Sequence, residues 1–201
     1  MTNQALRLEL LAMETEDRRT RQELFDAGAL GDQYVPRLQQ LHARNAARLH
    51  EIISTQGWPH QDLVGTDGAE AAWLIVQHAI GEPDFQRQAL VLLKEQAAQG
   101  RVPAWHGAYL EDRIAMYEDR PQRYGTQWID DPIDGRIRPW PLAEPVQVNE
   151  QRASVGLGPL RPVPELGPEL SHAEQQTIKE KHRWWRQWLA SRGWLAKDPS
   201  H

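Results

Sequence analysis

Glycine and proline divide the first 117 residues into segments whose apolar residues recur every three or four positions. This spacing gathers the apolar side chains on one face of an α-helix, and glycine favours the end of a helix. A capping box, Ser171 with Glu174, indicates a further helix near the C-terminus. We predict amphipathic helices over residues 4–27, 36–56, 83–100, 108–117 and from residue 171 onwards.

Residues 69–80 differ from these segments because they are apolar on nearly every face. The run from Ala71 to Val76 contains no polar residue, so we predict a helix buried at the centre of the domain. A short buried strand is the alternative, since periodicity does not separate the two over so few residues. The alanines, and the polar pair Gln77–His78 that follows, favour the helix.

The sequence changes character after the predicted helix over 108–117. Residues 124–133 and 136–142 flank Asp134–Gly135, a dipeptide typical of a tight turn between antiparallel strands. Prolines within both segments limit the pair to a short or edge hairpin. The proline-rich stretch over residues 139–168 is expected to be extended.

Together these elements predict a mainly α fold, a helical bundle-like single domain with a small β-hairpin and a proline-rich extended arm leading to a C-terminal helix. Residues 1–168 would form the helical domain, with the hairpin near residues 124–142, and residues 169–201 the tryptophan-rich helix and tail.

Composition excludes several classes of function. A net charge of −5 argues against a nucleic-acid-binding protein, which would show a basic face. The absence of cysteine excludes disulfides, thiolate metal sites and cysteine nucleophiles. Acidic residues interrupt any apolar signal-peptide core, and the longest apolar run is too short to cross a bilayer. We therefore expect a cytoplasmic protein that binds neither nucleic acid nor membrane.

A set of short motifs follows in order along residues 5–165: an Asp17/Arg21 pair, Gly57–Pro59, Leu63–Gly65, Ala72–Ala79, Asp84–Gln86, Ala108–Arg113, Gln122–Gln127, Val155–Leu157 and Pro159–Leu160. As a set they resemble the bacterial family labelled domain of unknown function 6624. The chain departs from that family at Gln151–Arg152 and at Leu142–Glu144. The family has no assigned activity, so the resemblance groups these motifs without implying a reaction.

His78 is the first candidate for a catalytic residue. Burying its imidazole with the amides of Gln77 and Gln86 costs free energy unless these groups pair with one another or with a ligand. A core histidine satisfied by one hydrogen bond is the alternative. Trp73, on the same segment, is a candidate for a pocket wall because tryptophan combines a large apolar surface with one donor.

Asp112 and Arg113 are adjacent on a predicted helix. Arg113 would bind a carboxylate or phosphate, while Asp112 would orient His78 or act as a base. A surface salt bridge of little energetic value is the alternative. For Asp17 and Arg21, one helical turn apart, we favour a plain intrahelical ion pair.

The predicted strand near residue 124 is rich in glutamine. Gln122, Tyr124 and Thr126 would share one face of it, and Gln127 the other. These side chains are a plausible wall for a polar ligand, or equally the outer face of an edge strand. A metal site built from His78, His106 and Asp112 has no spacing in its favour, so we predict none. No glycine-rich phosphate loop or nucleophile elbow occurs.

We therefore predict a small-molecule enzyme or ligand-binding protein that uses metal-independent acid/base chemistry on a polar or anionic molecule. The predicted catalytic residues are His78, Asp112 and Arg113, and the predicted ligand-binding residues are Gln86, Gln122, Tyr124, Gln127 and Trp73; the sequence names no cofactor. The alternative is a non-catalytic interaction module. In it the helix from Lys179 to Arg192 would dock on a partner or on a second subunit, a role we favour over membrane-surface binding.

Overall fold

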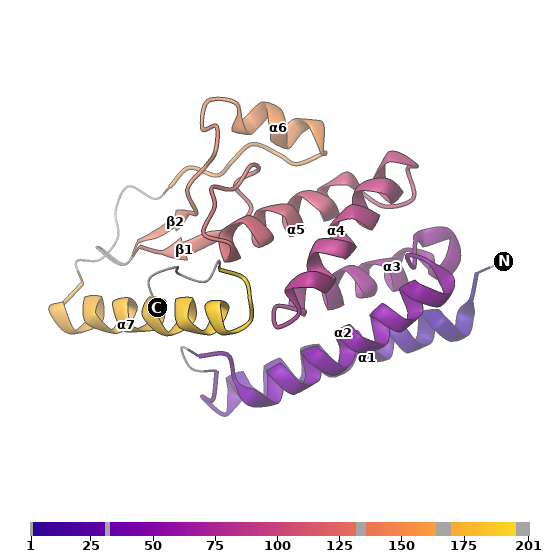
Figure 1. Ribbon diagram of the computed structural model, residues 1–201, viewed down its shortest axis with the longest axis horizontal. Helices are drawn as coiled ribbons and strands as arrows, with labels where there is room; N and C mark the ends of the chain where they lie inside the picture. The colour runs from indigo at the N-terminus through magenta and orange to yellow at the C-terminus, as the bar shows by residue number, and fades with distance from the viewer. Residues whose placement is uncertain (1, 31–32, 132–135, 164–169, 196–201) are drawn as a thin grey trace. The chain divides into compact units, whose positions relative to one another are not determined.

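A computed structural model describes residues 2–30, 33–131, 136–163 and 170–195 of the chain (Figure 1). These residues form seven helices and one two-stranded antiparallel sheet, so the predicted mainly α fold with a small hairpin is confirmed. The chain divides into two compact units, residues 1–107 and 108–201, which we describe separately. No helix in the described part of the chain has the length and apolar character needed to cross a lipid bilayer.

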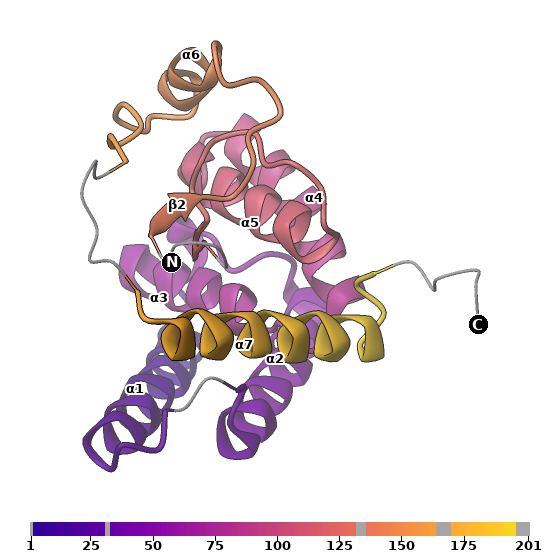
Figure 2. The same ribbon diagram turned by 90° about the vertical axis from the view of Figure 1, so that its left-hand side faces the viewer.

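Three long helices form the centre of the first unit. Helices α1 (Gln4–Asp26) and α2 (Pro36–Gln56) run antiparallel, side by side (Figures 1 and 2), and α3 (Gln61–His78) packs against both. Helix α4 (Pro83–Ala98) packs against α3, and α5 (Ala104–Tyr117) begins in this unit. The core between them is aliphatic, with Leu10, Leu49, Ile52, Ile75 and Val76 fully buried.

Helix α3 is the buried central helix expected over residues 69–80, and the strand alternative is wrong. It begins eight residues earlier than predicted, at Gln61, because the helical path resumes after a kink at Gly65. Gly65 has a φ of 75°, which glycine adopts without the steric cost of a side chain. The ion pair between Arg7 and Asp67 joins α1 to the segment just after the kink.

The second unit contains the hairpin and two further helices. Strands β1 (Trp128–Asp130) and β2 (Ile137–Pro139) pair antiparallel, with Trp128 opposite Pro139. The predicted Asp134–Gly135 turn lies outside the described residues. Helix α6 (Val148–Ser154) corrects the expectation of a wholly extended stretch, and its seven residues contain no proline to interrupt them.

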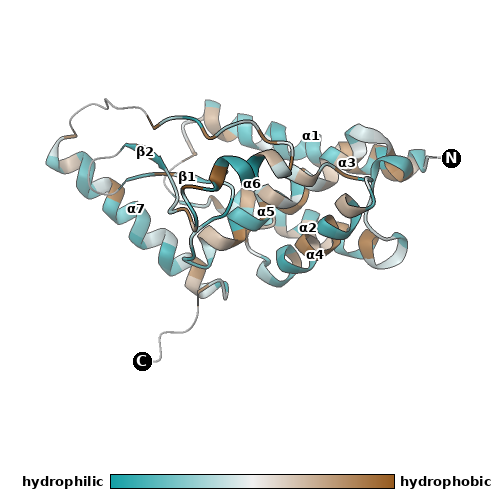
Figure 3. Ribbon diagram, turned by 90° about the horizontal axis from the view of Figure 1, so that it is seen from above, coloured by the Kyte–Doolittle hydropathy of each residue, from teal (hydrophilic) through white to brown (hydrophobic). Residues whose placement is uncertain are grey.

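Helix α7 (His172–Ser191) starts at the predicted capping box, with the Ser171 side chain accepting from the Glu174 amide. Figure 3 shows polar residues along much of its length. The rings of Trp184, Trp185 and Trp188 contact one another. Trp185 and Trp188 stack on each other, and Trp185 and Trp194 contact Tyr117 of α5. These rings pack within their own unit, and the predicted role of α7 in docking a partner stays a prediction.

The strand predicted to begin at residue 124 begins later in the structure, at Trp128 of β1. Residues 122–127 form a loop, so the expected alternation of Gln122, Tyr124 and Thr126 on one strand face is wrong. Backbone N–H groups that a sheet ladder would use are instead bonded to the side chain of Asp112. The predicted separation of residues 169–201 from the rest stays a prediction.

Candidate functional site

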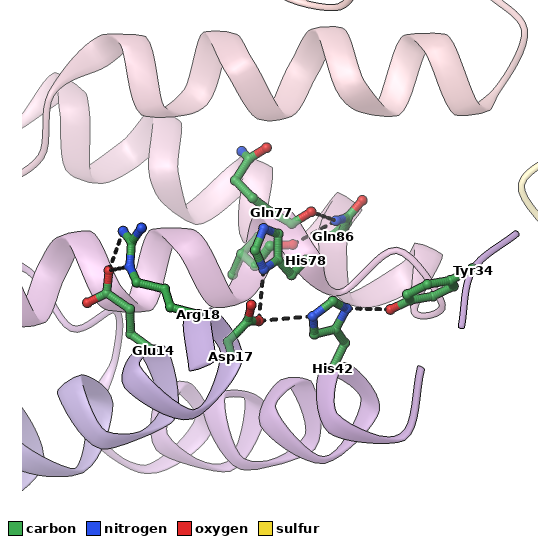
Figure 4. A network of polar contacts seen from close by, with 9 residues as sticks. Glu14, Asp17, Arg18, Tyr34, His42, Gln77, His78 and Gln86 are labelled. Carbon is green, nitrogen blue, oxygen red and sulfur yellow. Dashed lines mark hydrogen bonds and ion pairs between the residues drawn. The ribbon is translucent and has the colours of Figure 1, made fainter. Parts of the chain in front are cut away.

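A buried carboxylate joins three helices of the first unit (Figure 4). Asp17 of α1 accepts a hydrogen bond at Oδ2 from Nδ1 of His78, the last residue of α3, over 2.8 Å. Nε2 of His42, on α2, lies 2.9 Å from the same oxygen. We call Asp17, His42 and His78 the Asp17 cluster.

The helical spacing of the sequence places these groups. Asp17 occupies the same face of α1 as the buried Leu10 and Leu24, and His42 the face of α2 that holds Leu38 and Leu49. Asp17 and His42 are thus polar residues within two apolar stripes that meet in the core. The third polar residue, His78, lies at the end of α3. A buried polar group costs free energy unless it is paired, so these positions are not explained by packing alone.

The electrostatics of the cluster keep the carboxyl group ionised. Burial raises the pKa of Asp17, but its close contacts with the two imidazoles outweigh burial and hold that pKa well below its usual range. The rings of His42 and His78 lie close together, with centroids 4.9 Å apart. On its far side, Nδ1 of His42 is hydrogen-bonded to the hydroxyl of Tyr34.

Two atoms of the cluster are left without a hydrogen bond. Oδ1 of Asp17 is buried and has no partner. Nε2 of His42 is near Oδ2 of Asp17 but is not in hydrogen-bond geometry with it. The protein therefore buries one carboxylate oxygen and one imidazole nitrogen whose bonding capacity the described residues do not use.

The cluster borders an open pocket of about 530 Å³ in the same unit. His78 is the member that reaches it most, with 20% of its side chain exposed against 2% for Asp17 and 4% for His42. The remaining lining combines polar and apolar side chains: Arg18, Arg21, Gln22, Phe25, Leu30 and Leu74.

The two pocket arginines differ in their partners. Arg18 is hydrogen-bonded to Glu14, whereas Arg21 forms no hydrogen bond or ion pair with any residue that the structure describes. The expected intrahelical pair of Asp17 with Arg21 is wrong, because Asp17 faces the core and bonds to His78. Arg21 thus presents a guanidinium to the pocket, the group best suited to bind a carboxylate or phosphate.

The other predicted site residues of the first unit have structural bonds. The buried Gln86 donates from Nε2 to the carbonyl of Val76, over 2.6 Å, and so satisfies the last turn of α3. Trp73 donates to the carbonyl of His106 over 3.2 Å and stacks on its ring. Burial lowers the pKa of His106 to about 4, so this imidazole is neutral at pH 7.

In the second unit, the fully buried Asp112 holds the loop over residues 122–127. Its carboxylate accepts from the backbone N–H groups of Arg123, Tyr124 and Thr126, and from the Thr126 hydroxyl. Gln122 donates to the carbonyls of Gln127 and Trp140 and accepts from the Gln127 amide.

The structure thus groups the predicted residues in two sets. His78, Gln86 and Trp73 belong to the first unit, and Asp112, Arg113, Gln122, Tyr124 and Gln127 to the second. A single site that combines the two sets stays a prediction. In its own unit His78 adjoins Asp17 and His42. The sequence predicts an ion pair for Asp17 and does not indicate His42 as a site residue. The signal that could have found both is a polar residue within the apolar stripe of a helix.

Comparisons with known proteins give a family and no activity. No curated protein and no solved structure shows a significant match to the chain. One family model, described as a family of unknown function (DUF6624), matches residues 4–167 and so spans the Asp17 cluster, the pocket and the Asp112 loop. The chain belongs to the family of unknown function DUF6624.

Proposed function

We propose that the protein is an enzyme that acts on a small organic anion bound in the pocket beside His78. The observation that carries the proposal is the hydrogen bond between buried Asp17 and His78. His78 is the most exposed residue of the cluster, and it lines a pocket together with Arg21, which has no ion-pair partner among the described residues. A histidine oriented by a carboxylate is a common device for proton transfer, and arginine binds the anionic group of a substrate.

Each group at the pocket has a role in this proposal. Arg21 binds the carboxylate or phosphate of the ligand, and Phe25, Leu30 and Leu74 contact its apolar part. Asp17 fixes the orientation of His78, and the Asp17 cluster accepts or supplies the proton. The unused oxygen of Asp17 favours a site over a purely structural network, because a structural network is stable only when its members are satisfied.

Thermal-shift measurements test the anion site. A ligand that binds only the native state raises the melting temperature, so phenyl phosphate and benzoate should stabilise the protein and neutral benzyl alcohol should not. Arg21→Ala should abolish the stabilisation. Arg19→Ala is the matched control, because Arg19 lies on the same helix, pairs with Glu23 and does not line the pocket.

Two results would contradict the proposal. One is that neither anion stabilises the wild-type protein at millimolar concentration. The other is that Arg21→Ala and Arg19→Ala retain equal stabilisation, which would place the anion elsewhere on the surface.

A further inference from the structure

We propose that the Asp17 cluster binds one divalent transition-metal ion. Asp17, His42 and His78 each offer one ligand atom, and these atoms all lie within 4.8 Å of one another. Two imidazole nitrogens and one carboxylate oxygen form the donor set of catalytic zinc sites and of non-haem iron sites. The ligands come from three different helices, so the core of the first unit holds them in place before an ion binds.

The distances within the cluster suit such an ion. Metal–nitrogen and metal–oxygen bonds of about 2.1 Å at right angles separate neighbouring ligand atoms by about 3 Å. Oδ2 of Asp17 lies 2.8 Å from Nδ1 of His78 and 2.9 Å from Nε2 of His42. Only small shifts of the side chains would place all three around one ion.

The unused bonding capacity of the cluster is the second, independent observation. Oδ1 of Asp17 has no hydrogen bond although its side chain is 98% buried, and Nε2 of His42 approaches Oδ2 without hydrogen-bond geometry. Hydrogen bonds among the described residues therefore leave these two atoms unsatisfied. A metal ion would take the lone pair of Nε2, and bidentate coordination by the carboxylate would also use Oδ1.

Tyr34 supplies the outer contact that histidine ligands of metals usually have. Its hydroxyl is hydrogen-bonded to Nδ1 of His42, the nitrogen that would not face the ion. Such a bond fixes the tautomer and the orientation of a ligating ring.

An ion at this position deepens the proposed function and rests on it for the pocket and the class of ligand. Three protein ligands leave coordination positions open, as catalytic sites do. Asp17 balances only one of the two charges of the ion, and Arg21 adds another positive charge nearby. An anionic ligand held between the ion and Arg21 would compensate both. A bound ion would have Asp17, His42 and His78 as its ligands and would supply Lewis-acid chemistry at the pocket.

The test is metal binding by the full-length protein, without a polyhistidine tag and after removal of metal with EDTA. Titration with Co²⁺ should show one equivalent bound with a Kd below about 10 µM, together with the visible absorption bands of cobalt bound to nitrogen and oxygen ligands. Zn²⁺ should compete for the same site and raise the melting temperature.

Variants assign the ligands. Asp17→Asn, His42→Gln and His78→Gln should each weaken Co²⁺ binding at least a hundredfold, and Tyr34→Phe about tenfold. His50→Gln is the matched control, since His50 lies on α2 but contacts Phe85 outside the cluster, and it should bind Co²⁺ like the wild type. His78 is the most exposed ligand, so its variant is the one most expected to keep the fold, which circular dichroism verifies.

Absence of cobalt binding in the wild type, or binding unchanged in a folded His78→Gln variant, overturns the proposal. The Arg21→Ala variant separates it from the proposed function. That variant should keep the metal and lose the anion, so failure of the metal site leaves the anion result intact, and the reverse also holds.

Discussion

Among the residues that the structure describes, each unit contains one fully buried aspartate, and the two are bonded in different ways. Asp112 accepts hydrogen bonds at both oxygens, from three backbone N–H groups and one hydroxyl. Asp17 has its contacts at one oxygen, with two imidazoles, and its other oxygen has no hydrogen-bond partner in the described part of the chain. The same residue type at the same depth is thus saturated by the backbone in one unit and left with spare capacity in the other.

The difference shows why burial alone does not identify a functional carboxylate. Burial raises the pKa of Asp112, and its uncharged donors do not fully offset that effect. For Asp17, burial also raises the pKa, but its contacts with the two imidazoles bring it below its usual range. Backbone donors hold a loop in place and cannot be exchanged. Imidazole partners can give up a proton to a substrate or a lone pair to a metal.

The largest expected effect comes from making the same substitution at both positions. In Asp112→Asn an amide NH₂ replaces one oxygen, and backbone N–H groups of the loop are left buried without an acceptor. We expect a loss of about 4 kcal/mol of unfolding free energy. Asp17→Asn leaves no backbone group unpaired, and we expect a loss of about 1 kcal/mol.

Urea denaturation of both variants measures the two losses, with the slope of the transition as a check on two-state unfolding. Equal losses of unfolding free energy would contradict the comparison, because Asp17 would then contribute as much to stability as Asp112. A larger loss of unfolding free energy for Asp17→Asn than for Asp112→Asn would reverse the comparison.

Two buried histidines extend the comparison to pH. His106 is 1% exposed, and neither of its ring nitrogens has a hydrogen bond with a described residue, whereas Nδ1 of His42 is bonded to Tyr34. Its folded pKa of about 4 lies below the unfolded value of about 6.5, so the unfolded state binds more protons between these pH values. The stability that depends on neutral His106 is complete above pH 6.5 and falls as the pH drops towards 4. We expect this residue to account for a loss of about 2 kcal/mol between pH 7 and pH 5.

His106→Phe keeps an aromatic ring beside Trp73 and removes the titrating group. Urea denaturation at several pH values should show a flatter pH dependence for the variant than for the wild type. Identical pH profiles would mean that protonated His106 finds a partner or water in the native state.

Helical periodicity predicted most of the fold and part of the site. The ends of α1, α2 and α4 follow from glycine and proline, and α7 from its capping box, because these signals act locally. The contact of Asp17 with His78 joins residues 61 positions apart, and no local pattern encodes it. The sequence does not predict that α3 begins at Gln61, because glycine at position 65 is typical of a helix end. The sequence does not predict the loop over residues 122–127, because the N–H groups of Arg123, Tyr124 and Thr126 bond to the side chain of Asp112 on α5.

The smallest expected effect concerns one donor to Asp112. Thr126→Val keeps the shape of the side chain but removes the hydroxyl that donates to Oδ2 and accepts from Nε2 of Gln127. The backbone amides of Tyr124 and Thr126 still donate to that oxygen, so we expect a loss of about 1 kcal/mol, measured by urea denaturation. Thr126→Ser keeps the hydroxyl and should therefore retain most of the unfolding free energy that Thr126→Val loses. A loss as large as that of Asp112→Asn would show that the hydroxyl, and not the backbone, holds the loop, and the contrast between the two aspartates would then rest on side chains in both units.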